Sequence, residues 1–372
     1  MVQSDGTPRN SPQDRRSPLD KDKVKAFTER VFADVAGAMT AGMGYLGVKT
    51  GLFRTMVGKG PMRVEDVARE TKLVPRYVEE WLKGMTTAKY LDYDPATKTY
   101  RLPDEHAYLL ASDDSDHFMG GLFPIVPVLL RLAPDVAIAF ERGGGVPFEK
   151  FGPEGVFGLD VMNRGQYEHR LTSYWLKAMP DVQARLEAGG RALDVGCGAG
   201  RIAVTLAKAF PKAKVVGLDP DRESIRQAEA GAAEAGLSGR VSFVASTTGN
   251  LDRGEGFDLI TACDCIHDFA APQPTLKEIR ALLKPEGTLF IIEPRAADQL
   301  EDNINPRKLR AESACRRKAE HDEERQHEHL HDHERRLRAG RRQLVQEGQF
   351  GEGLNDADES VQIERAVIAA TT

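Results

Sequence analysis

The sequence predicts a doubly wound α/β domain preceded by a smaller, mainly helical domain. In the second half of the chain, short apolar runs alternate with helical patterns, which is typical of a parallel sheet covered by helices on both faces. One of these runs ends in three alternate glycines, Gly196, Gly198 and Gly200, a pattern that turns a buried strand sharply into a helix. In the first half, helical patterns lead into a hairpin. The sequence therefore predicts two domains with a linker between them.

The composition is that of an ordinary globular chain. The 372 residues are 41% hydrophobic and 29% charged, and the net charge of -6 argues against a general nucleic-acid binder. Four cysteines make no disulfide framework at this length, so we expect reduced thiols, no metal site and a cytoplasmic protein. The longest apolar stretch, residues 118–140, is broken too often by proline and charge for a membrane span, and we expect buried helices there.

The N-terminal third predicts a winged helix. Residues 1–22 are polar and proline-rich, and we expect a disordered tail. Within residues 23–110 a long helical pattern is followed by a short helix over Val64 to Thr71, by a helix that starts at Pro75, and by a two-stranded hairpin. Helix, helix and hairpin in this order resemble a winged helix.

The second helix of this unit would face DNA if the unit bound DNA. Its exposed charges are of both signs, Arg76, Glu79, Glu80 and Lys83, so phosphate contacts would be few and partly opposed. We therefore expect no DNA binding, and keep a DNA-binding regulator as the alternative.

Residues 111–185 form a helical linker, and residues 186–306 form the α/β domain. The linker is rich in aromatic side chains, which either line an apolar pocket or fill the core between the domains. In the α/β domain we expect a first strand that ends in the glycine turn. Further strands are expected at 214–219, 241–245, 257–262 and 287–293, and helices at 222–235 and 275–283.

The charges around the glycine turn favour a cationic ligand. The spacing is G-x-G-x-G, and Arg201 stands where a dinucleotide fingerprint has its third glycine. Asp194, before the first glycine, would repel a pyrophosphate but attract an ammonium or a sulfonium. Asp219, at the end of the next strand, could accept hydrogen bonds from both hydroxyls of a ribose.

Adenosine with a cationic amino-acid tail describes S-adenosylmethionine. Leu193 to Gly200, with Asp219, resembles motifs I and II of the class I methyltransferases, which implies a Rossmann-like sheet and S-adenosylmethionine as cofactor. Residues Ser246 to Thr248 depart from the acidic adenine contact of many relatives. The expected cofactor-binding residues are Asp194, Gly196, Cys197, Gly198, Gly200, Asp219, Pro220, Ser246 and Cys263.

The passage after the fourth strand carries the candidate catalytic residues. His267-Asp268-Phe269 resembles the His-Asp-aromatic passage of O-methyltransferases, in which the histidine deprotonates the acceptor. An imidazole titrates near neutrality and suits a general base. We expect His267 to be that base and Asp264 to be an alternative acceptor contact, although a histidine here can also merely pack beside the ligand.

From Val24 to Pro306 the chain resembles bacterial-type methyltransferases with an N-terminal winged helix. The resemblance implies a small-molecule methyl acceptor and a homodimer, in which the winged helix dimerises and helps to wall the acceptor pocket. O-methylation is favoured over N- or C-methylation. The alternatives are a winged-helix regulator that senses S-adenosylmethionine and a catalytically impaired methyltransferase.

Residues 307–372 depart from this resemblance. They are charged and rich in histidine, with little apolar periodicity, and we expect a solvated tail or a charged helix rather than a zinc site. Residues 361–369 are an exception that could form a strand. A shift of the coding frame near Pro306 would explain the break, and would leave the sheet without one edge.

Overall fold

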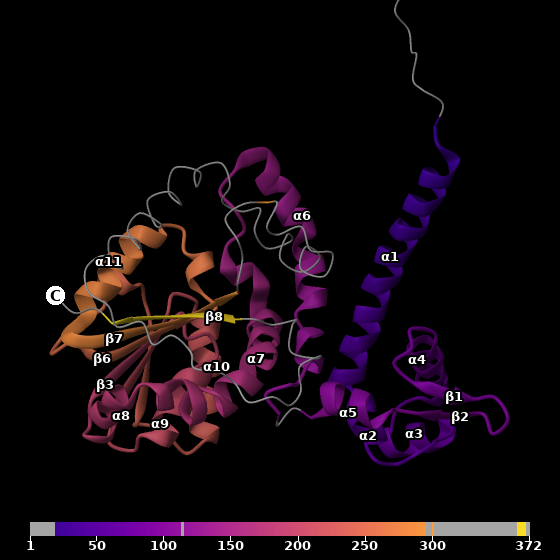
Figure 1. Ribbon diagram of the computed structural model, residues 1–372, viewed down its shortest axis with the longest axis horizontal. Helices are drawn as coiled ribbons and strands as arrows, with labels where there is room; N and C mark the ends of the chain where they lie inside the picture. The colour runs from indigo at the N-terminus through magenta and orange to yellow at the C-terminus, as the bar shows by residue number, and fades with distance from the viewer. Residues whose placement is uncertain (1–18, 113–114, 295–299, 301–362, 370–372) are drawn as a thin grey trace, which may run out of the picture.

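The computed structural model describes residues 19–112, 115–294, 300 and the backbone of 363–369 (Figure 1). The N-terminal region is mainly helical, as the sequence predicts. Its elements are α1 (Lys21–Lys49), α2 (Leu52–Met56), α3 (Val64–Thr71), α4 (Pro75–Thr87), β1 (Asp92–Asp94), β2 (Thr99–Arg101) and α5 (Asp104–Ala111).

Helices α3 and α4 and the hairpin β1–β2 make the winged helix. Tyr93 pairs with Tyr100 across the hairpin, and the two rings lie 4.8 Å apart. The core beneath them is apolar, because α4 turns its buried side chains inward at helical spacing. That core includes Phe53, Met56, Val67, Val78, Trp81, Leu82 and Met85.

Helices α1 and α6 differ from the prediction, α1 in where it begins and α6 in how much of it is exposed. Helix α1 begins at Lys21, inside the expected tail, and runs out from the winged helix with most of its length exposed (Figure 1). The expectation of buried helices at 118–140 is wrong for much of α6 (Val126–Arg142), which buries Val128 and Leu132 but exposes Leu130 at 58% and Phe140 at 66%. By length and composition alone, α1 and the stretch Gly120–Arg142 are each apolar enough to cross a bilayer.

The linker runs from α6 to the sheet through α7. Gly152 has a φ of 67° and opens α7, which passes between the N-terminal region and the sheet (Figure 1). The linker elements are η1 (Gly120–Leu122), α6, η2 (Phe148–Phe151), α7 (Gly152–His169), η3 (Leu171–Trp175), η4 (Leu176–Ala178) and α8 (Pro180–Glu187).

The second domain is a parallel sheet of five strands with a sixth, antiparallel strand at one edge. The strand order is β5-β4-β3-β6-β7-β8. The chain builds outward from β3 to β5 and then returns to place β6 on the other side of β3, so the strand order reverses between β3 and β6. The elements are β3 (Arg191–Val195), α9 (Arg201–Ala209), β4 (Lys214–Asp219), α10 (Arg222–Glu234), β5 (Val241–Ala245), η5 (Thr248–Asn250), β6 (Phe257–Cys263), η6 (Ile266–Asp268), α11 (Pro272–Leu282), β7 (Leu283–Pro294) and β8 (Ile363–Ala369).

Alternate side chains of the strands build two cores. Ala192 and Val215 face the cluster formed with α8 and α9, whereas Leu193 and Ile260 face the cluster formed with α11. Both faces of the sheet are therefore covered, as expected for a doubly wound sheet. The place for a ligand in such a sheet is the carboxyl edge of the strands, where the strand order reverses between β3 and β6.

The outer edge of β7 is paired. Strand β8 runs antiparallel to it, with Thr288 opposite Ala369 and Pro294 opposite Ile363. The expected strand is confirmed over 363–369, so the expectation that the sheet lacks this edge is wrong. The frame shift itself concerns residues outside the described ones and stays a hypothesis. The expected charged tail or helix at 307–342 and the expected tail at 1–18 lie outside the described residues.

Candidate active site

The glycine turn needs its glycines for two reasons. Gly196, Gly198 and Gly200 have φ values of 66°, 50° and 76°, which side chains disfavour. In addition, a Cβ on Gly196 would lie 2.7 Å from the Cβ of Cys265, and one on Gly200 would lie 2.7 Å from the ring of Phe243. The sequence thus forms a tight strand-to-helix turn at the carboxyl edge of β3.

Asp219 ends β4 and faces this turn. One carboxylate oxygen accepts the amide of Gly198 at 2.9 Å, and the other accepts the amide of Asp221 at 2.9 Å. Burial raises the pKa of Asp219, and the two amide hydrogen bonds oppose that effect. The carboxylate is therefore held against the glycine turn, and each oxygen keeps a second site that can accept a hydrogen bond.

Asp194 lies near the end of β3 and is buried, only 2% exposed. Its Oδ1 accepts the hydroxyl of Thr261 at 2.7 Å. Oδ2 has no partner at full hydrogen-bond geometry among the described residues, although the backbone amide of Ala203 is near enough to oppose the rise of the Asp194 pKa. Burial raises the pKa of Asp194 to about 7, and the nearby charge of Asp219 adds to the rise. In its free state this carboxyl is thus poised between its neutral and its charged form near neutral pH.

The other residues expected at the cofactor lie at the same edge but differ in exposure. Pro220 is exposed, and Ser246 is half-buried with its amide donating to the Asp219 carbonyl at 3.1 Å. Cys197 and Cys263 are buried free thiols, and burial raises the pKa of each. Buried thiols of raised pKa are unreactive, which agrees with a structural role.

The chain leaves β6 through an unusual backbone conformation. Asp264 has a φ of 55°, which is rare for a residue with a side chain. Its amide donates to the carbonyl of Ile292 at 2.7 Å, and its carboxylate accepts the side-chain amide of Asn163, from α7, at 3.0 Å. Burial raises the pKa of Asp264. The turn directs the following residues toward the end of β7.

Glu293, near the end of β7, receives that segment. Its Oε1 accepts the amides of Cys265 at 3.1 Å and Ile266 at 2.7 Å, and its Oε2 pairs with Nδ1 of His267 at 2.5 Å. Burial alone would lower the pKa of His267, but the hydrogen bond and charge of Glu293, with Asp268 nearby, raise it to about 9. The expectation that this imidazole titrates near neutrality is therefore wrong for the free protein.

Sequence reasoning missed Glu293 and Asn163. Glu293 had a usable signal, since it ends the strand next to β6, and carboxyl ends of neighbouring parallel strands meet at one edge. Asn163 had none, because it lies 101 residues before Asp264 in an unremarked helix.

Asp264, His267 and Glu293 also have the donor types of a metal site. Their ligand atoms lie within 4.8 Å of one another. However, Glu293 already uses both oxygens for His267 and for two backbone amides, and Asp264 binds Asn163. The described geometry is that of a hydrogen-bonded cluster, so we assign no metal to it.

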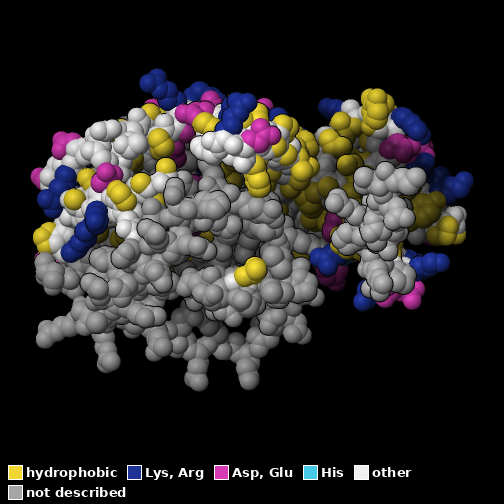
Figure 2. Space-filling view, turned by 90° about the horizontal axis from the view of Figure 1, so that it is seen from above, with side chains coloured by type: hydrophobic (Ala, Val, Ile, Leu, Met, Phe, Trp, Pro, Cys, Tyr) yellow, Lys and Arg dark blue, Asp and Glu magenta, His cyan; other side chains and the backbone are white. Residues whose placement is uncertain are grey.

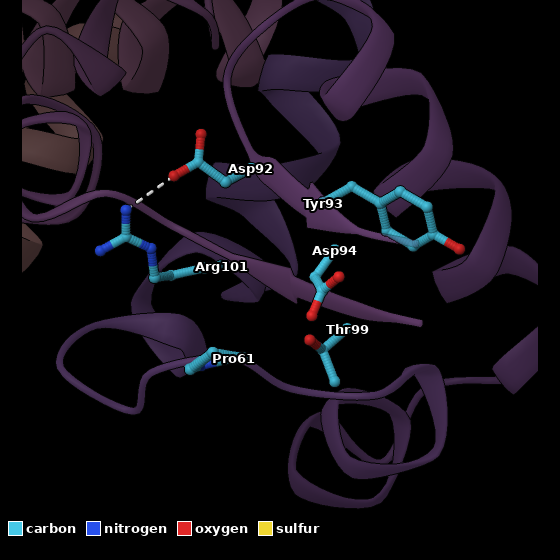
Figure 3. Close-up of a pocket in the computed structure, with 6 residues that line it drawn as sticks. All are labelled: Pro61, Asp92, Tyr93, Asp94, Thr99 and Arg101. Carbon is cyan, nitrogen blue, oxygen red and sulfur yellow. Dashed lines mark hydrogen bonds and ion pairs between the residues drawn. The ribbon is translucent and has the colours of Figure 1, made fainter. Parts of the chain in front are cut away.

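A shallow hollow on the wing lies far from this cluster. It has a volume of about 150 Å³ and lies between Pro61 and the hairpin, where Arg101 pairs with Asp92 at 2.7 Å (Figure 3). Asp94 points toward Thr99 and is used in its own turn, accepting the hydroxyl of Thr97 at 2.6 Å. The polar side chains of this hollow are hydrogen-bonded or paired within the hairpin, and we assign no ligand to the hollow.

Two family models match the chain in turn. Residues 38–112 match the Rv2258c-like winged HTH domain, and residues 186–342 match a methyltransferase domain. The second match confirms the predicted α/β domain and continues past its expected limit at residue 306. The chain thus combines a winged helix-turn-helix domain with a methyltransferase domain.

Curated relatives match over little more than a quarter of this chain. A ubiquinone biosynthesis O-methyltransferase of Bradyrhizobium diazoefficiens is 31% identical over 103 residues, which is 28% of this chain and 39% of that protein. The Nitrobacter winogradskyi protein of the same name is 36% identical over 104 residues, which is 27% of this chain and 38% of that protein. The chain therefore matches about two fifths of the length of these relatives.

Solved structures match over both domains. Human N-acetylserotonin methyltransferase in complex with S-adenosylmethionine has a TM-score of 0.53 at 19% identity, over 78% of this chain and 84% of that one. The mitomycin 7-O-methyltransferase MmcR has a TM-score of 0.53 at 17% identity, over 75% and 84%. These likenesses establish the fold that both domains share with such proteins.

Proposed function

We propose that this chain, in which a winged helix-turn-helix domain precedes a methyltransferase domain, transfers a methyl group from S-adenosylmethionine to a small acceptor. The observation that supports this most is the meeting of the glycine turn and the His267–Glu293 pair at one edge of the sheet. In this proposal residues 186–306 bind the cofactor, residues 111–185 line the acceptor pocket and residues 23–110 dimerise.

The residues at the edge fit the proposed cofactor. Asp219 has free acceptor sites for ribose hydroxyls beside the glycine turn. A cation bound nearby would favour the charged form of the buried Asp194 carboxyl. The bound cofactor would supply a methyl group that is already activated by its sulfonium. The protein then has to position the acceptor and, for a hydroxyl acceptor, remove its proton.

His267 would remove that proton. Glu293 holds Nδ1, so Nε2 is the nitrogen available to an acceptor, with Asp268 at 3.7 Å from it. With a pKa of about 9, only about 1% of His267 is neutral at pH 7. The positive charge of a bound sulfonium would lower that pKa and so favour the neutral, basic form. The kcat/KM for S-adenosylmethionine, which reports the free protein, should therefore rise with pH toward 9.

A screen for methyl transfer tests the proposal. The purified protein would be incubated with methyl-labelled S-adenosylmethionine and a panel of phenols, carboxylates and amines at pH 7 and pH 9. A phenol or another hydroxyl acceptor that is methylated faster at pH 9 supports both the activity and the base. Transfer to carboxylates alone, independent of pH, would show that His267 is not the base.

The N-terminal region is assigned to dimerisation through α1, and its winged helix is not assigned to DNA. On α4, Arg76 lies 2.9 Å from Glu80, and Lys83 lies 2.6 Å from Glu79. These carboxylates compete with phosphate for the cations that a DNA contact would need, which supports the expectation from the sequence.

We infer that the second copy covers α1 and α6. Phe27, Phe32 and Met39 on α1 are each more than 65% exposed, and α6 exposes Leu130 and Phe140. Apolar side chains on these helices border the space between the two lobes (Figure 2). Apolar surface of this extent on long helices normally marks an interface. A second identical pair of helices offers a matching apolar face.

Sedimentation velocity tests the dimer. The unmodified chain should sediment as a dimer, and F27D with F32D should sediment as a monomer. Y77D, which changes an exposed aromatic residue of α4, serves as the control and should remain dimeric. A monomeric unmodified chain, or one that instead partitions onto lipid vesicles through α1, would contradict the dimer.

A further inference from the structure

Helix α7 touches both halves of the candidate site. Asn163 donates to Oδ2 of Asp264 at 3.0 Å. One turn earlier, Oδ1 of Asp160 accepts Nε of Arg201 at 2.9 Å, and Oδ2 accepts Nη2 at 2.8 Å. Arg201 directly follows the glycine turn, and Asp264 leads into the segment that carries His267. One turn of α7 therefore holds the cofactor turn and the catalytic segment at once.

The contact with Arg201 is shielded from water. The side chain of Asp160 is only 6% exposed, and it also accepts Nη2 of Arg164 at 2.6 Å. The remaining terminal nitrogen of Arg201 donates to Glu168 at 2.7 Å. Burial opposes the charged form of Asp160, but the two guanidinium groups outweigh it and lower its pKa. A two-pronged contact of this kind fixes orientation as well as distance.

The face of α7 opposite Asp160 and Asn163 packs against the backbone of residues 115–125. A Cβ on Gly165 would lie 2.3 Å from the carbonyl oxygen of Ser115, and one on Gly158 would lie 3.1 Å from the amide nitrogen of Ile125. Backbone contacts as close as these leave little room for the helix to slide. The position of α7 is therefore set by the linker and carried to Arg201 and Asp264.

We propose that α7 is a positioning helix that sets the cofactor turn and the His267 segment in register, through Asp160 on Arg201 and Asn163 on Asp264. This inference rests on the proposed function. Asn163 acts through Asp264, whose positive φ is a strained conformation that its neighbours must hold. Without the amide, that turn relaxes and the His267–Glu293 pair loosens.

The two contacts have separable effects, which two measurements can detect without an acceptor. Calorimetry gives the affinity for S-adenosylhomocysteine, and NMR of the histidine ring gives the titration midpoint of His267. N163A should lower that midpoint from about 9 toward the ordinary 6.5, because Glu293 no longer faces the ring, and should leave affinity within about twofold. R201K keeps the charge but loses the two-pronged contact with Asp160. It should weaken the affinity for S-adenosylhomocysteine about fivefold or more and leave the titration midpoint of His267 unchanged.

D160N is a second test of the contact with Arg201, and Q227A is the control. D160N tests the same contact as R201K from the α7 side, and should act in the same direction if R201K folds poorly. Gln227 of α10 donates to the Pro153 carbonyl at 3.0 Å, so it joins the start of α7 to the sheet domain away from both contacts. Q227A should change neither measurement, and circular dichroism would confirm that each variant is folded.

The outcomes distinguish this inference from the proposed function. An unmodified chain that does not bind S-adenosylhomocysteine overturns the proposed function itself. If the unmodified chain binds it, but N163A titrates like Q227A, the positioning of His267 by α7 is overturned. Equal affinities in R201K, D160N and Q227A would overturn the role of Asp160.

Discussion

The carboxyl edge of the sheet and the winged helix differ in whether they bury charged side chains. Among the described residues, the buried polar and charged side chains all lie in the sheet domain, and Asp194 and Asp219 lie at the carboxyl ends of β3 and β4. The winged helix buries only apolar side chains and keeps its charges in exposed pairs such as Arg76 with Glu80. Burying a carboxylate lowers the stability of the fold, whereas an exposed ion pair changes that stability little. The difference indicates that the sheet edge is built for a ligand and the winged helix for packing.

The largest expected effect concerns the base at the sheet edge. H267A should lower methylation of a hydroxyl acceptor by about 10²- to 10⁴-fold, or roughly 3 to 5 kcal/mol of barrier, because proton removal is lost. Cofactor affinity should hardly change. Steady-state kinetics with the acceptor found in the screen measures the first, and calorimetry with S-adenosylhomocysteine measures the second. D252A, which removes an exposed loop side chain outside the segment proposed to line the acceptor pocket, is the control.

The pH dependence of this reaction has a definite sign. Because the partnership with Glu293 raises the pKa of His267 to about 9, the neutral base becomes more abundant as pH rises from 7 to 9. E293Q keeps the shape of the side chain but removes its charge, so its pH profile should move to lower pH. A profile that is flat in the unmodified chain, or full turnover by H267A at pH 7, would show that transfer rests on positioning alone.

The next effect is the stability cost of the buried Asp194. Its pKa in the folded state, about 7, is above its unfolded value of 3.8, so the free protein loses stability as pH rises between these values. D194N carries no charge and lacks this loss. The stability of D194N relative to the unmodified chain should therefore rise by about 2 to 4 kcal/mol from pH 4 to pH 8. Urea unfolding at both pH values gives the difference, and a constant difference would show that Asp194 is not buried as described.

A somewhat smaller effect is expected at the ribose contact. D219A should weaken S-adenosylhomocysteine binding by about 1.5 to 3 kcal/mol, because charge-assisted hydrogen bonds are lost. Calorimetry would compare it with D252A, which removes an exposed loop carboxylate. Equal affinities for the two variants would remove Asp219 from the cofactor site.

The smallest effect is expected on the winged helix. Reversing Arg76 and Lys83 to glutamate breaks exposed pairs only, so the unfolding midpoint and the turnover should stay near those of the unmodified chain. Neither protein should bind duplex DNA in fluorescence anisotropy at low salt. Salt-dependent binding that disappears on charge reversal would make the winged helix a DNA-binding unit and would reverse the comparison.

The sequence predicted the fold better than the contacts of the site. Strands such as Lys214–Asp219 and the helix Val64–Thr71 follow from local periodicity and turn residues, and both are confirmed. The environment of His267 does not follow from local pattern, because Glu293 comes from another strand and Asn163, which holds Asp264, comes from a distant helix. Periodicity also could not show that α6 exposes half of its apolar residues, since buried and interfacial helices have the same pattern.

Thermal unfolding with S-adenosylhomocysteine and, separately, with NAD tests which ligand the glycine turn binds. At a hundred times its dissociation constant, a ligand that binds the native state stabilises it by about 2.7 kcal/mol. We expect such a rise with S-adenosylhomocysteine, a smaller rise in D219A, and no rise with NAD. A rise with NAD and none with S-adenosylhomocysteine would contradict it, because the glycine turn would then serve a dinucleotide.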